Sequence, residues 1–234
     1  MWKQKLYSSG LVIYCSLIMT AGGIQKDPGD GMKNSVNAAA IVSEQPVFIL
    51  PNVTLNSTAL HYAKDYLKKN NWGLSQIKKR SRTSLGIISS VFMKYDIPSD
   101  LKYMAVVESN LNTDLVCTST GATGIWQLMP FTADELGLNV DEGNDERLHI
   151  QKSSIAVAKY LKQLYDEFGD WLLVVAAYNS GPAKVTRAIQ LSGSHDFWKL
   201  QNFLPLETRN HVKRYISVLY FFEMPNNSSA TISA

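Results

Sequence analysis

A single glutamate stands out because it ends an apolar run and is followed at once by two polar residues. The run is Leu101–Val107, and Ser109 and Asn110 come directly after Glu108. A carboxyl group that emerges from a hydrophobic helix is desolvated, which disfavours its ionised form and raises its pKa. A raised pKa is what a general acid needs near neutral pH. The alternative interpretation is a helix-end glutamate that pairs with a lysine or an arginine.

Two downstream segments favour the chemical interpretation of this glutamate. Residues 121–130 read GATGIWQLMP, and residues 176–182 read AAYNSGP. A turn from Gly121 to Gly124 allows the backbone to pass close to a ligand. Gln127 offers both a hydrogen-bond donor and an acceptor within the first segment. Together the two segments favour the general-acid interpretation of Glu108 over the helix-end ion pair.

The larger side chains of these segments have two candidate roles each. Trp126 and Met129 would offer apolar faces, one to the cleft and one to the core, and simple core packing is the alternative. Tyr178 and Asn179 stand where a buried helix is expected to end, so that their polar groups can reach the cleft. For Tyr178 the alternative is a buried hydroxyl that is satisfied by a backbone carbonyl.

The elements that must position these residues are helices. Apolar residues recur at helical spacing from about residue 59, and almost no stretch alternates with a period of two, so the predicted fold class is all-α. The run Trp171–Tyr178 is so uniformly apolar that it should form a central buried helix, capped by Asp170. Ser99 or Asp100 is expected to cap the helix that carries the glutamate. The other expected helices begin near residue 59 or cover residues 84–95, 133–136, 153–168, 183–191 and 207–222.

The N-terminus predicts an export signal. Lys3 and Lys5 precede the apolar stretch Leu11–Met19, which is followed by small residues and is too short for a transmembrane helix. An uncleaved membrane anchor is the alternative. If the signal is removed, Cys117 is the only cysteine and is expected as a lone buried thiol. We expect a signal peptide at residues 1–23, a linker or loosely ordered arm at 24–57, the folded domain at 58–224 and a polar tail at 225–234.

The composition and the charge distribution indicate which kinds of partner the protein could bind. The chain has 234 residues, of which 45% are hydrophobic and 18% charged, and its net charge is +3, which is typical of one globular domain with tails. Lys78–Arg82 holds four cations, but such a cluster is typical of a solvated helix end, and the export signal argues further against nucleic acid. An anionic wall polymer is the better partner for this patch. No His, Cys or Asp residues have the spacing of metal ligands, so neither a metal nor an organic cofactor is expected.

The motifs around the glutamate resemble, in order and spacing, the soluble lytic transglycosylase family, a goose-type-lysozyme-like family that cuts the glycan strands of peptidoglycan. The resemblance covers about Ser84 to Glu223 and rests on the Glu-Ser pair, the two segments above and residues 204–209 (LPLETR). Residues 169–173 (GDWLL) and 196–200 (DFWKL) resemble in particular the D-type branch of membrane-bound lytic murein transglycosylases. Three ordered motifs together are far more specific than one short pattern.

The resemblance implies an all-α lysozyme-like (goose-type) transglycosylase domain with Glu108 as its single acid/base. As the acid, Glu108 would protonate the oxygen between N-acetylmuramic acid and N-acetylglucosamine, and the bond would break through an oxocarbenium-like state. As the carboxylate, it would then take the proton of the muramoyl C6 hydroxyl, which attacks C1 and forms a 1,6-anhydro ring. The resemblance also implies substrate contacts for Ser109, Thr118, Gln127, Met129, Tyr178, Asn179 and Glu207.

Several features depart from the family pattern or carry little signal by themselves. Thr118 stands where serine is common, and His211 stands where tyrosine is common; Tyr215, one helical turn later, could replace that tyrosine. The glycan-binding LysM modules that often follow the D-type domain are missing, so wall targeting is expected from the cleft or from a partner. Glu207, taken from the sequence alone, is an ordinary acidic residue at a helix start.

We therefore predict an exported lytic transglycosylase of the bacterial cell envelope, located in the periplasm, that acts on peptidoglycan glycan strands. Ordinary glycosidases use two carboxylates, whereas Asp114, Glu135 and Glu142 fall in segments expected to be surface loops or exposed helix. This counts against a hydrolytic muramidase on the same fold, which stays an alternative. A non-catalytic peptidoglycan-binding protein is the other alternative. Association with the membrane or the wall, and the oligomeric state, stay open.

Overall fold

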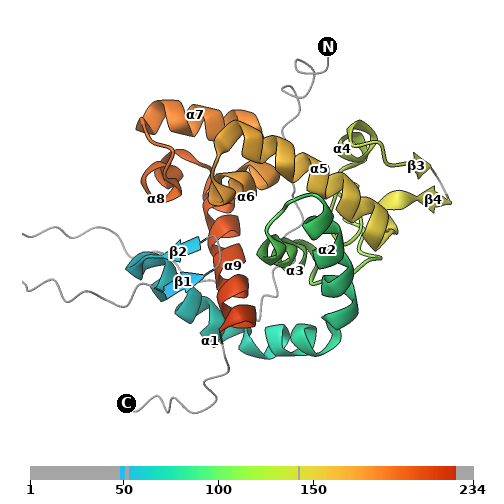
Figure 1. The fold of residues 1–234 in the computed structure, drawn as a ribbon, viewed down its shortest axis with the longest axis horizontal. Helices are drawn as coiled ribbons and strands as arrows, with labels where there is room; N and C mark the ends of the chain where they lie inside the picture. The colour runs from blue at the N-terminus through green and yellow to red at the C-terminus, as the bar shows by residue number, and fades with distance from the viewer. Residues whose placement is uncertain (1–47, 51–52, 142, 225–234) are drawn as a thin grey trace, which may run out of the picture.

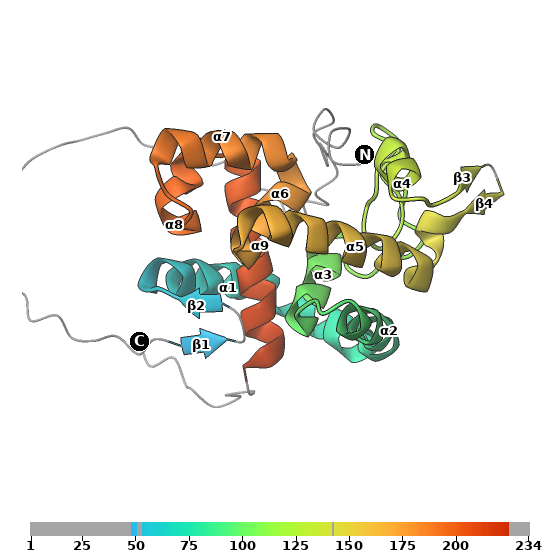
Figure 2. The same cartoon turned by 45° about the horizontal axis from the view of Figure 1, so that its top comes forward.

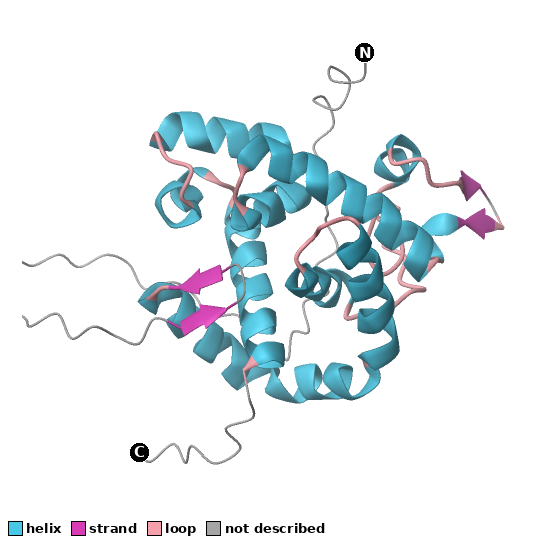
Figure 3. Ribbon diagram, viewed as in Figure 1, coloured by secondary structure: helices cyan, strands magenta, loops and turns pink. Residues whose placement is uncertain are grey.

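The computed structural model describes residues 48–50, 53–141 and 143–224, and nearly all of their regular structure is helical (Figure 3). The predicted all-α class is confirmed. The α-helices are α1 (Ser57–Arg80), α2 (Arg82–Lys94), α3 (Met104–Ser109), α4 (Pro130–Glu135), α5 (Ile150–Phe168), α6 (Trp171–Ser180), α7 (Pro182–Ser192), α8 (Phe197–Leu200) and α9 (Leu206–Glu223). The short elements are the 3-10 helices η1 (Ser99–Tyr103), η2 (Glu146–Leu148) and η3 (Gln201–Phe203) and the strands β1 (Phe48–Leu50), β2 (Val53–Leu55), β3 (Val140–Asp141) and β4 (Asn144–Asp145).

Local sequence explains where several helices begin and end. Helix α1 begins after Asn56, whose side-chain oxygen accepts a hydrogen bond from the backbone N–H of Ala59 at 2.8 Å. Asp170 caps α6 in the same way, through the N–H of Leu173 at 3.0 Å, as the sequence predicted. Helix α5 ends before Gly169, which adopts a left-handed conformation with φ of 65°. These caps satisfy backbone groups that a helix end leaves without partners.

Helix α6 lies at the centre of the core. Its residues from Leu172 to Ser180 are all buried, as the apolar run predicted. It packs against α5, α7 and α9, and α9 in turn packs along α1. Figure 1 shows α9 (red) running through the middle of the molecule, with α6, α7 and α8 toward one end and α1 beside it. Helix α9 therefore connects the N-terminal helix to the centre of the domain.

Two antiparallel hairpins stand on opposite sides of the molecule (Figure 2). In the first, β1 pairs with β2 so that Phe48 lies opposite Leu55; in the second, β3 pairs with β4 so that Val140 lies opposite Asp145. The first hairpin contacts α1 and the second contacts α4. Two short strands bury too little surface for independent stability, so both hairpins depend on the helices.

Several predicted boundaries differ in the structure. Helix α3 is preceded by η1, so that Tyr103, rather than Ser99 or Asp100, occupies its N-cap position. Helix α4 begins earlier than predicted, at Pro130, because the missing N–H of a proline costs nothing in the first helical turn. Helices α1 and α2 are separated only by Ser81, so the cationic cluster spans one helix end and the next helix start.

The predicted signal peptide and C-terminal tail lie outside the described residues, and so does most of the predicted linker. No helix in the described part of the chain combines the length and the apolar character that crossing a bilayer requires. Cys117 is buried, as predicted. The expectation of a lone thiol concerns the chain after removal of residues 1–23, and it stays a prediction.

Candidate active site

Glu108 lies in the last turn of α3 and is almost completely buried. Only 5% of the residue is exposed. Burial raises the pKa of its carboxyl group to about 8; the Arg214 cation opposes this rise, and the Glu207 carboxylate adds to it. The carboxyl group is therefore mostly protonated at neutral pH, which is the state that a general acid requires.

Helix α9 presents a polar face to Glu108. Glu207, His211 and Arg214 follow one another at spacings of four and three residues, which places them on one side of the helix. The Nε2 atom of His211 lies 3.3 Å from Oε1 of Glu108. Burial, with a further contribution from the Arg214 cation, holds the pKa of His211 well below its usual range. The pair is thus a protonated acid beside a neutral imidazole rather than an ion pair.

The contact between Glu108 and His211 leaves buried polar atoms unsatisfied. Oε1 of Glu108 and Nε2 of His211 lack hydrogen-bond geometry toward each other, and neither atom has another hydrogen-bond partner among the described residues. A buried polar atom without a partner costs about 1–3 kcal/mol. Such atoms are typical of catalytic sites, where a ligand or a water completes the hydrogen bonding.

The chain turns sharply after Glu108. Asn110 adopts a left-handed conformation with φ of 54° and ends α3. The hydroxyl of Ser109 donates to the carbonyl oxygen of Ile125 at 2.8 Å. That hydrogen bond ties the end of α3 to residues 115–128, which we call the glycine loop. Ser109 is itself buried, so it positions the backbone around the acid in this structure.

Arg147 holds the glycine loop in place. Its guanidinium donates to the carbonyl oxygens of Gly121 at 2.7 Å and Leu128 at 3.0 Å, and it pairs with the carboxylate of Asp145 at 2.6 Å. Gly124, whose φ is 81°, lies so close to the backbone carbonyl of Arg147 that a Cβ atom would not fit. The glycine turn was expected to bring the backbone close to a ligand. At Gly124 the close approach is instead to Arg147.

Three of the candidate side chains point into the domain. Gln127 is fully buried, and its Nε2 donates to the carbonyl oxygens of Leu115 and Gly124 at 3.1 and 2.9 Å. Its Oε1 has no hydrogen-bond partner among the described residues. Trp126 is fully buried in the core. Tyr178 is also fully buried, and its hydroxyl donates to the carbonyl oxygen of Trp126 at 2.8 Å. In this structure Trp126 packs in the core and the Tyr178 hydroxyl is satisfied by a backbone carbonyl. These are the alternatives that the sequence left open for the two residues.

The remaining residues that the resemblance implied are spread over several elements. Thr118 is exposed on the glycine loop, and Met129 is half-buried against the core. Asn179 is buried near the end of α6. Glu207 is half-buried in the first turn of α9, close enough to Glu108 to raise its pKa. Of these four residues, Glu207 is the one whose charge acts on the buried acid.

The structure places His211, and not Tyr215, in contact with Glu108. Tyr215 is buried one turn further along α9. Burial raises the pKa of its hydroxyl, and the charged or polar groups that add to this rise are Asp100, Tyr103 and Glu223. Tyr215 therefore has neighbours other than the acid, because one further helical turn carries it toward Asp100 and Tyr103 of η1, which precedes α3.

The acidic residues that the sequence analysis placed in surface loops or exposed helix contribute no second carboxylate in the described part of the chain. Asp114 is exposed and Glu135 is half-buried at the end of α4, while Glu142 lies outside the described residues. Within residues 48–50, 53–141 and 143–224, no group of three His, Cys, Asp or Glu side chains is arranged to hold a metal ion.

A small cavity of about 50 Å³ adjoins Glu108. Sequence reasoning missed two of its contributors, Tyr66 and Leu74 of α1, because no local pattern tells which side of α1 faces the acid. It also missed Arg214, although the spacing from Glu207 was a usable signal. The lining residues are Tyr66, Leu74, Val106, Val107, Glu108, Asn110, Arg214 and Val218.

Comparison with known proteins finds similarity in the central part of the chain. Residues 92–201 match the family described as the transglycosylase SLT domain. The chain is 32% identical over 158 residues to the membrane-bound lytic murein transglycosylase D of Escherichia coli (strain K12), a match that covers 65% of this chain and 34% of that protein. The chain thus spans about a third of the length of this relative.

Two solved structures share the fold. One is an inactive mutant of the lytic transglycosylase Slt from Pseudomonas aeruginosa, with a TM-score of 0.50 and 22% identity over 58% of this chain and 23% of that chain. The other is the 70 kDa soluble lytic transglycosylase from Escherichia coli, with a TM-score of 0.50 and 22% identity over 70% of this chain and 30% of that chain. At this identity the likeness concerns the fold, and it agrees with the lysozyme-like domain that the sequence implied.

Proposed function

We propose, on the premise that residues 92–201 form a transglycosylase SLT domain, that this protein is a peptidoglycan lytic transglycosylase with Glu108 as its single acid/base. The observation that carries the proposal is the buried carboxyl group of Glu108, whose raised pKa keeps it protonated near neutral pH. The unsatisfied polar atoms beside it support a ligand at this place. The related protein in Escherichia coli is named a lytic murein transglycosylase, which agrees with the same substrate.

The proposed reaction uses the two protonation states of one carboxyl group. Glu108 gives its proton to the oxygen that joins N-acetylmuramic acid to N-acetylglucosamine, and the bond from muramoyl C1 to that oxygen breaks through an oxocarbenium-like state. The carboxylate then accepts the proton of the muramoyl C6 hydroxyl while the C6 oxygen bonds to C1. The acid is regenerated, the product carries a 1,6-anhydro ring, and no water is consumed.

His211 has a positioning role in this proposal. Its neutral imidazole lies 3.3 Å from the carboxyl group and adds no positive charge that would favour the carboxylate before the bond breaks. The Arg214 cation favours the carboxylate, so it would stabilise Glu108 after proton donation. Of these two residues on one face of α9, Arg214 therefore favours the carboxylate of Glu108, and the neutral His211 does not add to that effect.

A hydrolytic muramidase on the same fold is the nearest alternative. It would require a second carboxylate and a bound water on the opposite face of the sugar ring. Among the described residues, Glu207 is the carboxylate whose charge acts on Glu108. Glu207 is therefore the first candidate for the second carboxylate of a muramidase. A peptidoglycan-binding protein without turnover is the other alternative, and the unsatisfied atoms at Glu108 and His211 are compatible with binding alone.

Mass spectrometry of the soluble products distinguishes these functions. The mature protein is incubated with purified peptidoglycan, and lysozyme digestion of the same preparation is the control. We expect muropeptides one water lighter than the lysozyme products, because the C6 hydroxyl replaces water as the nucleophile. Hydrated reducing ends would instead favour the muramidase. Absence of products, with the protein still retained on peptidoglycan, would favour the binding protein.

The pH dependence of turnover is a second expected result. We expect kcat/KM to fall about tenfold per pH unit above pH 8, because Glu108 then loses the proton that it must donate. Since this pKa is higher in the folded protein than its ordinary value of 4.5, the contribution of Glu108 to stability is fully present below pH 4.5 and is lost as the pH rises through about 8. Steady-state kinetics across pH measures the fall in kcat/KM, and urea unfolding across pH measures the loss of stability.

The variant Glu207→Gln provides the control for this pH profile. Removing the Glu207 charge removes one cause of the raised pKa of Glu108, so the alkaline limb of kcat/KM should move to lower pH. Arg214 of α9 keeps acting on the Glu108 carboxyl group in this variant, and His211 of α9 and Tyr178 of α6 still lie near it. An alkaline limb below pH 6 in the unmodified protein would contradict a buried protonated acid.

We further propose that the protein acts in the bacterial cell envelope. The apolar N-terminal stretch with its preceding lysines supports export to the periplasm, and the related transglycosylase D is named membrane-bound. The predicted partner is the peptidoglycan glycan strand. Fractionation of cells that produce the full chain, with detection of the protein in periplasmic, membrane and cytoplasmic fractions, tests this location.

A further inference from the structure

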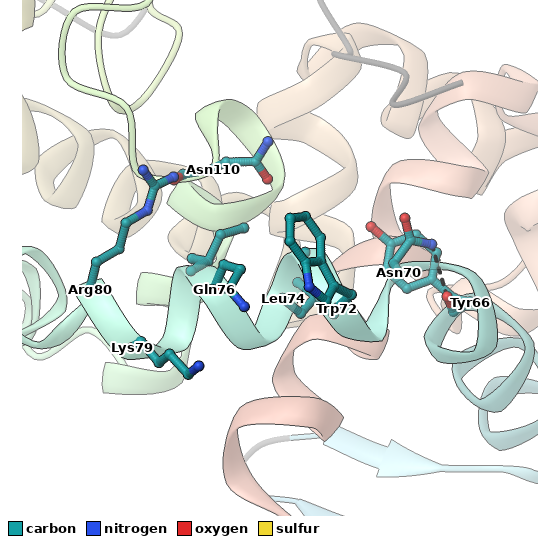
Figure 4. Close-up of a pocket in the computed structure, with 10 residues that line it drawn as sticks. Tyr66, Asn70, Trp72, Leu74, Gln76, Lys79, Arg80 and Asn110 are labelled. Atoms are coloured by element: carbon teal, nitrogen blue, oxygen red, sulfur yellow. Dashed lines mark hydrogen bonds between the residues drawn. The ribbon is translucent and has the colours of Figure 1, made fainter. Parts of the chain in front are cut away.

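A pocket of about 490 Å³ lies along α1, and its lining residues other than Asn110 fall outside residues 92–201, which match the transglycosylase family. Figure 4 shows the side of α1 that borders it, with the Trp72 ring standing out from the helix and Asn110 extending from the chain after α3. Small-molecule sites commonly have volumes of roughly 300–1,000 Å³. The lining residues are Tyr66, Asn70, Trp72, Gly73, Leu74, Gln76, Ile77, Lys79, Arg80 and Asn110.

This α1 pocket adjoins the cavity beside Glu108. The two share Tyr66, Leu74 and Asn110 as lining residues. The cavity at Glu108, of about 50 Å³, has room for about one or two waters but not for a sugar ring. A polymer whose scissile bond reaches Glu108 must therefore place its neighbouring sugars elsewhere, and the α1 pocket is an adjoining space of sufficient volume.

The side chains of the α1 pocket are suited to an amino sugar. Trp72 is 76% exposed, and a large exposed indole offers a flat apolar face to the axial hydrogens of a pyranose ring. Asn70 donates through Nδ2 to the carbonyl oxygen of Tyr66 at 2.8 Å, which fixes its amide and leaves the amide oxygen as an acceptor. Gln76 is exposed and adds a second amide.

The same pocket carries positive charge next to the catalytic end. Arg80 and Lys79 are exposed at the last turn of α1, and Nη2 of Arg80 donates to the carbonyl oxygen of Asn110 at 3.2 Å. That hydrogen bond holds the guanidinium beside the turn that follows Glu108. A guanidinium in this position can bind a carboxylate with its remaining N–H groups.

We propose that the α1 pocket binds the peptidoglycan strand next to the scissile bond, with Trp72 against one amino-sugar ring and Arg80 facing the carboxylate of a muramoyl lactyl or peptide substituent. This inference rests on the proposed function. In this proposal α1 forms one side of the substrate-binding site. Helix α1 packs along α9, and residues of α1 therefore line the cavity at Glu108. The substrate class is an N-acetylated amino-sugar polymer with anionic substituents.

Isothermal titration of variants made in the Glu108→Gln protein tests the pocket without turnover. The probes are a neutral N-acetylglucosamine oligomer and solubilised peptidoglycan strands that carry stem peptides. Trp72→Ala should raise the Kd for both probes about fivefold or more, because an aromatic contact is lost, whereas Trp72→Phe should keep most of the affinity. Arg80→Gln should weaken only the anionic strands, since glutamine removes the charge and stays polar.

Phe131→Ala is the matched control, since Phe131 is an exposed aromatic residue of α4, 56% accessible, that does not line the pocket. Equal Kd values for the Trp72→Ala and Phe131→Ala variants would overturn the inference, and so would the absence of binding of either probe to the parent protein. A failure of the proposed function can be distinguished from a failure of the pocket proposal. If Trp72→Ala weakens binding but the unmodified protein yields no anhydro products, the pocket is a glycan site in a protein without this activity.

Discussion

Replacing Glu108 with glutamine is expected to lower kcat on peptidoglycan by about 10²- to 10⁴-fold. Glutamine keeps the shape of the protonated carboxyl group, but it can neither give a proton to the leaving oxygen nor take one from the C6 hydroxyl. Because one residue serves both steps in the proposed reaction, no second carboxyl group would compensate. The measurement is the initial rate of release of soluble anhydro-muropeptides from purified peptidoglycan.

Binding and stability distinguish this loss from unfolding. The Glu108 carboxyl is already mostly uncharged at pH 7, so a neutral amide should leave the unfolding midpoint close to that of the unmodified protein. The variant should also still sediment with insoluble peptidoglycan. Glu207→Gln is the carboxylate control, and its effect on kcat should be much smaller because Glu207 is not the proton donor in the proposed reaction and acts on Glu108 through its charge. Unchanged turnover in the Glu108→Gln protein would rule out this residue as the acid.

Arg147→Met is expected to cost about 3 kcal/mol or more of unfolding free energy, the largest stability effect that the structure predicts. The substitution removes the donor to the carbonyl oxygens of Gly121 and Leu128 and leaves the Asp145 carboxylate without its partner. Arg147 is only 7% exposed, so water does not replace these hydrogen bonds readily. The glycine loop should loosen, and turnover should fall as well, because Ser109 joins that loop to the end of α3.

The ion pair between Lys152 and Glu146 provides a matched control for Arg147. Its atoms also lie 2.6 Å apart, but the lysine side chain is 52% exposed, so Lys152→Met should cost at most about 1 kcal/mol. Urea unfolding at pH 7, followed by circular dichroism, compares the two variants. If Arg147→Met is no more destabilising than Lys152→Met, the guanidinium does not hold the loop as described.

Much of the fold could be predicted from sequence because its signals are local. The apolar run before Tyr178, the capping residue Asp170 and the helix-ending Gly169 each act within one or two helical turns. Their effects therefore do not depend on distant packing. Boundaries were less accurate where a tertiary contact or a proline decided the first turn, as at α3 and α4.

The candidate site was predictable in its central residue and less so in its surroundings. Residue type alone marked Gln127 and Tyr178 as polar groups for a cleft, but both are buried and satisfy carbonyl oxygens of the glycine loop. A donor that can reach a ligand can equally reach a backbone carbonyl, and sequence does not tell which one lies nearer. Arg147, which orders the same loop, had no motif to identify it.

The sequence by itself determined that Glu108 ends a short apolar helix, because hydrophobic residues at consecutive positions must be buried whatever packs on them. Burial is the largest cause of the raised pKa of the Glu108 carboxyl group, so the chemistry of an acid was present in the local pattern. Only the tertiary structure decided what faces that acid. Packing of α9 brought His211 and Arg214 to it, and packing of α1 added Tyr66 and the α1 pocket. Such contacts join residues far apart in the chain, and their choice depends on the shape of the whole core.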